Sequence, residues 1–150
     1  MTNLKEVLFQ QCVAHVNTRL QTIQTIISSH QKALSSETKS SAGDKHETGR
    51  AMLQLEMEKA GQQLAVVQQM QQTLAKINSS KPSTKIALGS VIKTSSTYYF
   101  LSISAGELTI KETVYFAISP SSPIGKLLMG KKVEDTFIWR GKEIKIDRVL

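Results

Sequence analysis

The sequence predicts an α+β protein built of two parts in series. Residues 1–78 are expected to form an antiparallel helical hairpin, and residues 86–150 an antiparallel sheet with one short helix. Two observations predict this division. Apolar residues of the first part recur at helical spacing in two mirrored runs. Seven of the eight aromatic residues follow residue 81, whereas the first 80 residues are rich in Gln and hold only Phe9. The two parts therefore bury different kinds of core.

The hairpin is predicted from its own symmetry. The first run has the alternating three-and-four spacing of a coiled-coil seam: Val13, Val16, Leu20, Ile23, Ile27, His30 and Leu34. The second run has the same spacing: Leu53, Met57, Ala60, Leu64, Val67, Gln71 and Leu74. Paired from the inside out, the residue numbers of every pair sum to 87. Residues at equal height on two antiparallel arms are equidistant from the turn, which places it between Gly43 and Asp44 and the tip at residues 40–48.

The tip carries two carboxylates three residues apart, Asp44 and Glu47. One interpretation is structural, because Asp44 as helix N-cap and Glu47 at the third helical position would form a capping box. The other is functional, since two hard oxygen donors at an exposed tip can help to hold a divalent cation. The two interpretations are compatible, because a capping carboxylate keeps a free oxygen.

Residues 79–85 are polar and contain Pro82, which predicts a linker. Five strands are expected after it, at residues 86–92, 97–103, 113–118, 136–139 and 143–149, with Arg140-Gly141-Lys142 joining the last two. Ser122 as N-cap, Pro123 at the first helical position and Gly130 as the stop predict a short helix between them. Its buried stripe would be Ile124, Leu127 and Leu128.

Charge and composition restrict the class of protein. The net charge is +7, of which residues 1–80 carry +2 and residues 81–150 carry +5. A basic second part favours a polyanionic partner such as nucleic acid, or it serves solubility alone. The single Cys12 cannot form an intramolecular disulfide, and the first residues lack the apolar stretch of a signal peptide. No apolar run approaches the roughly 20 residues that span a bilayer, so we expect a soluble, cytoplasmic protein without a membrane partner.

Several motifs resemble the GreA/GreB family of bacterial transcription elongation (transcript cleavage) factors. Gly43-Asp44-Lys45-His46-Glu47 is similar to the family's Gly-Asp-x-x-Glu tip. The stretch from Ser122 to Asp135 is similar to the most recognisable part of its FKBP-like C-terminal domain, and Leu88-Gly89-Ser90-Val91 resembles that domain's start. The resemblance covers nearly the whole chain in the same order. It implies a helical hairpin followed by an FKBP-like domain.

The resemblance also implies a function. The C-terminal domain would dock at the secondary channel of RNA polymerase, and the matching docking residues are Ser122, Pro123, Ile124 and Gly125. The hairpin would enter the channel, where Asp44 and Glu47 would help to hold a second Mg²⁺ in the polymerase active site and assist cleavage of backtracked RNA. Polymerase and nucleic-acid contacts at the tip would come from Lys45, His46 and Arg50. Such a factor has no cofactor of its own, is not itself an enzyme, and is expected to be a monomer that meets the nascent RNA and DNA of the elongation complex.

The tip departs from the family pattern in one stretch. After the Glu, the family usually continues with Asn-Ala, an acidic residue and an aromatic one, whereas this chain has Thr48-Gly49-Arg50-Ala51. A Gre-like modulator or inhibitor without cleavage activity is therefore an alternative. In the second domain, Glu134 stands where the family usually has Gly, which we interpret as a variation in a surface turn.

Two further alternatives come from other classes of protein. The FKBP-like domain could be a peptidyl-prolyl isomerase or a peptide-binding module, with Tyr98, Phe116 or Trp139 lining an apolar pocket. Aromatic residues in so small a domain are more often core residues. The chain could also be a coiled-coil adaptor without any chemistry at the tip.

Overall fold

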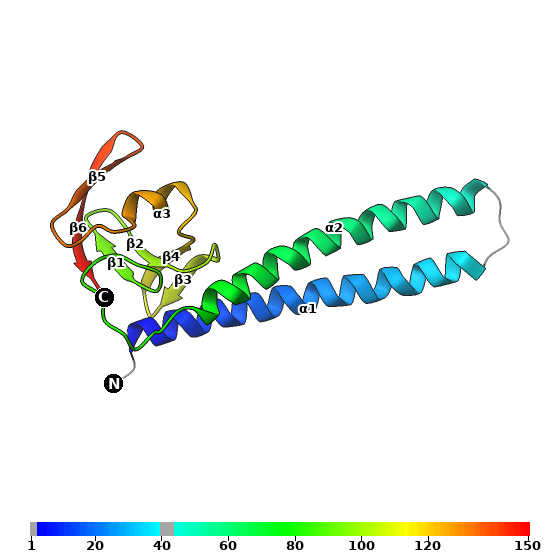
Figure 1. The fold of residues 1–150 in the computed structure, drawn as a ribbon, viewed down its shortest axis with the longest axis horizontal. Coiled ribbons are helices and arrows are strands. Elements are labelled where there is room, and N and C mark those ends of the chain that lie inside the picture. Colours follow the sequence, from blue (N-terminus) through cyan, green and yellow to red (C-terminus); the bar gives the residue numbers. More distant parts are fainter. Residues whose placement is uncertain (1–2, 40–43) are drawn as a thin grey trace. The chain divides into compact units, whose positions relative to one another are not determined.

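The computed structural model describes the backbone of residues 3–39 and 44–150, and the side chains of residues 3–36 and 48–150. Two long helices come first, α1 (Leu4–Lys39) and α2 (Asp44–Ala75) (Figure 1). The strands and the short helix that follow are β1 (Val91–Thr94), β2 (Tyr98–Leu101), β3 (Gly106–Ile110), β4 (Thr113–Ile118), α3 (Pro123–Leu128), β5 (Thr136–Trp139) and β6 (Lys142–Val149). These elements make an α+β fold, as predicted. The chain divides into two compact units, residues 16–70 and residues 1–15 with 71–150.

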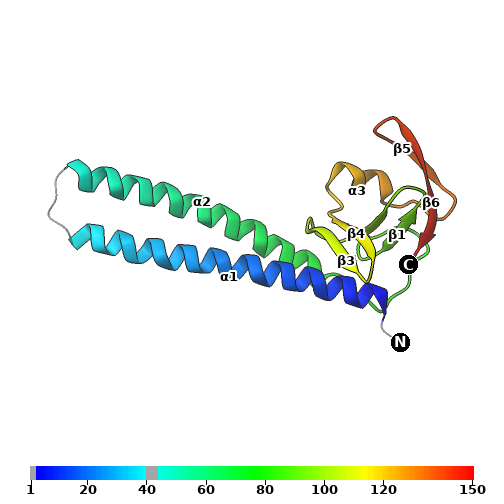
Figure 2. The ribbon, with the colours of Figure 1, turned by 180° about the vertical axis from the view of Figure 1, so that it is seen from behind.

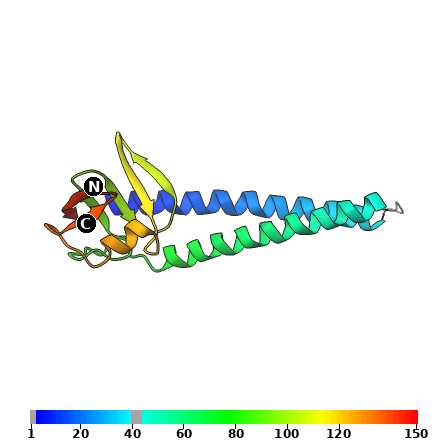
Figure 3. The ribbon, with the colours of Figure 1, turned by 90° about the horizontal axis from the view of Figure 1, so that it is seen from above.

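The hairpin unit contains most of α1 and α2, which run side by side (Figure 3). The predicted apolar seam is confirmed by its burial, since every seam position except Gln71 is buried or half-buried. Contact between the arms is visible at Arg19, whose Nη1 lies 3.7 Å from the Sδ of Met70. Those two residue numbers sum to 89, close to the predicted 87. The predicted turn residues 40–43 lie outside the described residues, and α2 begins at Asp44.

Gln71 is the one wrong position in the predicted seam. It is exposed, and Met70 beside it is half-buried. The steps from Val67 to Met70 and from Met70 to Leu74 keep the three-and-four spacing, so the apolar Met70 can occupy the seam equally well. Burying the Gln71 amide without a partner would cost free energy, and the side chain faces solvent instead.

The sheet of the second unit has six strands in the order β3-β4-β2-β1-β6-β5 (Figure 1). Five antiparallel strands were predicted, and two corrections follow. β2 and β4 are paired in parallel, so the sheet is mixed. β3 was missed because it is an edge strand in which only Leu108 is buried, so its sequence lacks the apolar alternation that marks a strand. The bounds of β4 and β5 agree with the prediction.

The first predicted strand is displaced towards the C-terminus. Residues 86–90 form a turn region in which the Ser90 N–H donates to the Ala87 carbonyl, and only Val91 onwards is β1. Gly89 takes a φ of +94°, a backbone conformation that would be strained in a residue with a side chain. The apolar character of this stretch comes from Ile86, which is buried without being part of a strand.

Helix α3 begins and ends where the sequence predicted. The Ser122 side chain accepts a hydrogen bond from the Gly125 N–H, and Pro123 is the first helical residue. Gly130, at a φ of +82°, follows the C-cap residue Met129. α3 contributes to the main core of this unit, whose buried members are Ile86, Ile92, Tyr99, Leu101, Ile124, Leu128, Phe137, Ile144 and Ile146.

The ends of the two long helices belong to the same unit as the sheet. In the first turns of α1, Leu8 and Cys12 are fully buried. The Cys12 Sγ lies 3.6 Å from the Ser102 Oγ, and burial raises the pKa of this thiol. Nearby, the Lys5 Nζ donates to the Lys81 carbonyl at 2.7 Å, and the Ser79 hydroxyl donates to the Glu6 carboxylate.

Among the helices that the structure describes, none combines the length and the apolar character of a membrane span.

Candidate functional site

The predicted tip residues lie in the first turn of α2. Asp44 is its first residue and Glu47 follows three positions later, so their backbone positions share one face of the helix. The side chains of Asp44, Lys45, His46 and Glu47 lie outside the described residues. Arg50 is described and exposed; it lies three positions beyond Glu47 and is therefore a neighbour of Glu47, but not of Asp44, on the helix surface. Among the described residues, no group of three or more His, Cys, Asp or Glu side chains could hold a metal ion.

The four predicted docking residues differ in how much they expose. Pro123 is exposed and Ser122 half-buried, whereas Ile124 and Gly125 are buried. The Ser122 hydroxyl donates to the Ser119 carbonyl at 2.6 Å and accepts from the Gly125 N–H at 3.1 Å, so it is engaged within its own loop. A direct contact with a partner is therefore open to Pro123 and to part of Ser122. Ile124 and Gly125 shape the loop from inside.

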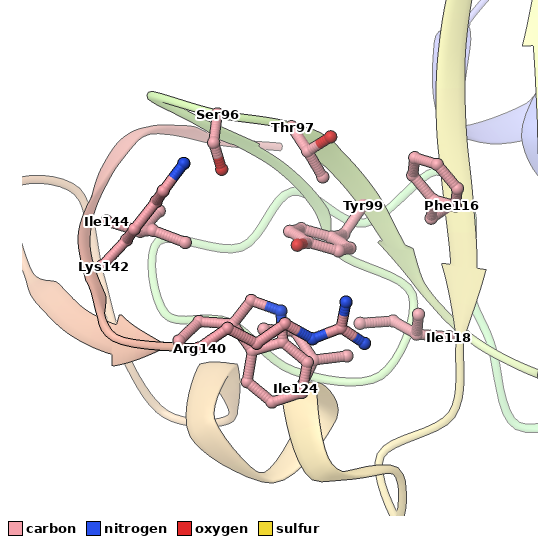
Figure 4. A pocket seen from close by; sticks show the side chains of 10 residues that line it. Ser96, Thr97, Tyr99, Phe116, Ile118, Ile124, Arg140, Lys142 and Ile144 are labelled. Atoms are coloured by element: carbon pink, nitrogen blue, oxygen red, sulfur yellow. The ribbon is translucent and has the colours of Figure 1, made fainter.

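The C-terminal domain contains a cavity of about 570 Å³ (Figure 4). Its apolar lining comes from Tyr99, Phe116, Ile118, Ile124, Trp139 and Ile144. Its polar lining comes from Ser96, Thr97, Arg140 and Lys142. Residues of the strands β2, β4, β5 and β6 and of the helix α3 contribute to it. The cavity is thus assembled from residues that lie up to 48 positions apart in the chain.

A strained turn places the cationic group of this cavity. Arg140 and Gly141 form the two-residue connection of β5 and β6 and take φ values of +53° and +79°. Positive φ at both positions is typical of a type I′ turn, in which Asn-Gly is the favoured pair. Arg140 therefore occupies a backbone conformation that disfavours its side chain. Its guanidinium lies 5.3 Å from the centre of the Trp139 ring and extends into the cavity in Figure 4.

The cavity is positively charged. Burial raises the pKa of Tyr99, and the nearby Arg140 charge opposes that rise, so the Tyr99 hydroxyl stays protonated at neutral pH. Within the part of the chain that the structure describes, neither Arg140 nor Lys142 has an ion pair with a carboxylate; the ion pair found there joins Lys145 to Glu134 at 2.9 Å. An apolar cavity with an uncompensated guanidinium suits a ligand that is apolar and anionic at once.

The sequence located part of this cavity. Phe116 and Trp139, which the isomerase alternative named, line the cavity, but Tyr98 does not. Both also pack against the core, which is the more common role of aromatic residues. The Tyr98 ring lies 5.6 Å from the Tyr115 ring and 5.5 Å from the Lys93 Nζ, and the neighbouring Tyr99 enters the cavity instead. Successive side chains of a strand point to opposite faces of the sheet, so Tyr98 and Tyr99 face opposite sides. The sequence does not show which face of β2 borders the cavity. Arg140 was assigned to a turn, and nothing in the sequence shows that it reaches the cavity.

Comparison with known proteins found a likeness among solved structures only. No protein-family model matches the chain, and no curated protein does. Among solved structures, one described as "Structure of the transcription factor Gfh1" covers 94% of this chain and 92% of its own, with 16% sequence identity and a TM-score of 0.35.

Proposed function

We propose that the protein is a Gre-like factor that binds bacterial RNA polymerase through the secondary channel. Its tip carboxylates then assist the polymerase in cleaving the 3′ end of backtracked RNA. One observation carries this proposal: Asp44 and Glu47 of the motif lie in the first turn of the long helix α2, which follows the long helix α1 in the chain. The two carboxylates therefore belong to the end of a helical arm. The part of α1 that belongs to the hairpin unit, residues 16–39, is about 36 Å long, which suits a probe into a deep channel.

The donor set at the tip fits Mg²⁺ only as part of a shared site. Magnesium binds oxygen ligands in octahedral geometry, and Asp44 with Glu47 supplies too few of them. The polymerase and water would complete the shell. A second metal ion in such a site stabilises the attacking and leaving oxygens of phosphodiester hydrolysis. In this proposal Asp44 and Glu47 position the ion, and Lys45, His46 and Arg50 contact phosphates or channel acids.

The test is transcript cleavage in stalled elongation complexes made from purified polymerase. The wild-type protein is compared with the double variant Asp44→Asn/Glu47→Gln, which removes both negative charges and keeps the side-chain size. Glu58→Gln is the matched control, since Glu58 is an exposed acid elsewhere on α2. Wild type and Glu58→Gln should shorten the RNA, and the double variant should not. Equal cleavage by all three proteins would remove the tip from the mechanism.

The same assay separates cleavage from inhibition. In the stretch Thr48-Gly49-Arg50-Ala51, Arg50 and Ala51 replace the acid and the aromatic residue usual in the family. The Arg50 guanidinium near Glu47 competes with a cation for that carboxylate. A protein that slows nucleotide addition without shortening the RNA would be the modulator or inhibitor. A wild-type protein that neither alters transcription nor comigrates with polymerase would refute both forms of the proposal.

The cavity favours a second candidate function, proline isomerisation by the C-terminal domain. Its aromatic lining of Tyr99, Phe116 and Trp139 could hold a proline ring. A protease-coupled isomerisation assay on a proline peptide tests this directly, with Trp139→Leu as the variant. Rates equal to the uncatalysed reaction for the wild-type protein would exclude it.

A further inference from the structure

Strand β5 is an unprotected edge of the sheet. It pairs with β6 alone among the described strands, and Figures 1 and 2 show it at the border of the sheet. Its sequence, Thr-Phe-Ile-Trp, contains neither charge nor proline. Ile138 at its middle is 70% exposed. Natural edge strands usually carry charges, prolines or bulges that prevent pairing with another chain, so this edge resembles one that is kept free for pairing.

The register of the hairpin shows which backbone groups are free. Trp139 and Lys142 are opposite each other and close the two-residue turn, so they form the hydrogen-bonded pair of that turn. In an antiparallel ladder, hydrogen-bonded and non-hydrogen-bonded pairs alternate. Ile138 and Thr136 are therefore the residues whose N–H and C=O groups point away from β6. An extended peptide along this edge could hydrogen-bond to both residues.

The C-terminal end of this edge leads into the cavity. Trp139 lines the cavity as the last residue of β5, and Arg140 follows it. A segment paired with β5 would thus bring its side chains to an apolar space that contains a guanidinium and the Lys142 ammonium. An apolar side chain fits the space, and a carboxylate beside it could form a bidentate pair with Arg140. Arg140 has a strained backbone conformation, and such conformations cluster at binding sites.

We propose that the free edge of β5 and the adjoining cavity bind an extended acidic segment of a partner protein. The segment adds a strand beside β5, buries an apolar side chain against Trp139, and places a carboxylate on Arg140. This interaction requires neither the tip carboxylates nor a proline in the ligand. It can therefore be tested independently of the proposed transcript cleavage and of proline isomerisation.

Charge decides between a partner protein and a second copy of this chain. Two copies joined edge to edge through β5 would bring two Arg140 and two Lys142 side chains near the same interface. Residues 81–150 carry 11 basic and 6 acidic residues, so two such domains repel each other. An acidic segment has the complementary charge and neutralises the cavity.

Fluorescence of Trp139 provides the binding assay, because Trp139 is the only tryptophan and lines the cavity. The probe is a synthetic eight-residue peptide that alternates leucine and aspartate, titrated into the full-length protein. The comparison peptide has lysine in place of aspartate. The aspartate peptide should change the fluorescence saturably, and the lysine peptide should not do so at the same concentrations. An equal response to both peptides would contradict the proposal.

Two pairs of variants test the two parts of the site. Arg140→Gln should weaken binding of the aspartate peptide about tenfold, the loss expected for one charge-assisted pair, whereas Arg148→Gln outside the cavity should not. Ile138→Pro removes an outward N–H and should weaken binding, whereas Ile138→Thr keeps that N–H and should bind like wild type. Thermal unfolding verifies that each variant is folded.

Two further results would overturn the proposal. The first is full binding by Arg140→Gln, which would remove the charge recognition. The second is a concentration-dependent dimer in sedimentation that Ile138→Pro abolishes, which would assign the edge to a second copy.

Discussion

Arg140 shows how one residue can oppose the preferences of its own turn. Its φ of +53° is disfavoured for a side chain as large as Arg, and Asn is favoured at this position of a type I′ turn. The Arg140 guanidinium gains a contact with the Trp139 ring, which is worth about 0.5–1 kcal/mol at an exposed site. That gain is smaller than or similar to the backbone cost of about 1–2 kcal/mol. Stability alone therefore does not explain why Arg stands here.

We expect Arg140→Asn to leave the protein at least as stable as wild type, with a gain of about 0.5 kcal/mol. The same variant should lose binding of the aspartate peptide, because the guanidinium is gone. Chemical denaturation measures the first effect and Trp139 fluorescence the second. A variant that is clearly less stable would show that the contact with Trp139 outweighs the strain of the turn.

Gly125 has a packing reason to be glycine. A Cβ built on it would lie 2.1 Å from the Ser119 carbonyl oxygen and 2.9 Å from the Ser122 Oγ. The first of these atoms belongs to the backbone and cannot turn away. We expect Gly125→Ala to destabilise the domain by about 1–3 kcal/mol, as overpacking does. Denaturant unfolding followed by Trp139 fluorescence measures this, with Lys126→Ala as control because Lys126 is an exposed residue of the same helix. Equal stability of the two variants would mean that the loop yields freely.

Lys5 is a buried cation, 7% exposed, and desolvation lowers its pKa. Because the folded-state pKa lies below the unfolded one, the charged form opposes folding at neutral pH. This cost disappears as pH rises through the folded pKa towards 10.5. Lys5→Met also loses the hydrogen bond to the Lys81 carbonyl, so the test is the change with pH. The unfolding temperature of Lys5→Met relative to wild type should be lower at pH 10 than at pH 7. Lys81→Met, a substitution of an exposed lysine, is the matched control. An advantage of Lys5→Met that grows with pH would reverse the sign of this argument.

At the scale of elements, the seam of the hairpin distinguishes neighbouring residues. Val67 is fully buried, whereas Val66 is 47% exposed. An aspartate at position 67 would place a carboxylate in the apolar seam, where an unpaired charge is costly. We expect Val67→Asp to destabilise the hairpin by about 3 kcal/mol or more and Val66→Asp to have little effect. Thermal unfolding followed by far-ultraviolet circular dichroism distinguishes the two. Similar melting of both variants would contradict the predicted seam.

The strands of the sheet, unlike the helices, depend on pairing with other parts of the chain. β3 is an edge strand with a single buried residue, Leu108, and it forms because β4 offers a partner. β2 and β4 pair in parallel although β3 lies between them in the chain. Local sequence does not encode such a pairing, because a strand's own residues determine its faces but not its neighbours.

At the scale of the whole molecule, the two units carry separate spectroscopic reporters. The far-ultraviolet signal comes largely from α1 and α2, whereas Trp139 reports on the unit that contains the sheet. Because Val67 lies in the hairpin unit, Val67→Asp should lower the helical transition more than the Trp139 transition. Coincident transitions in the variant would mean that the units unfold together. Wild-type protein melted under the same conditions is the reference.

Features that depend on residues close together in the chain could be predicted from the amino-acid sequence. The seam, the caps of α3, and the bounds of β4 and β5 follow from periodicity and from the chemistry of Ser122, Pro123 and Gly130. Such signals act within a few residues, and local backbone preferences are enough to express them. The sequence also located Phe116 and Trp139 as lining residues, since large aromatic side chains must be buried somewhere.

The contacts between residues far apart in the chain became known only from the folded domain. It selected Tyr99 over Tyr98 for the cavity, paired β2 with β4, left β5 free at the edge, and turned Arg140 from a turn residue into the cationic group of a candidate binding site. The physical reason is the same in each case. These outcomes depend on which faces and strands come together across long stretches of chain, and that choice is made by the packing of the whole domain.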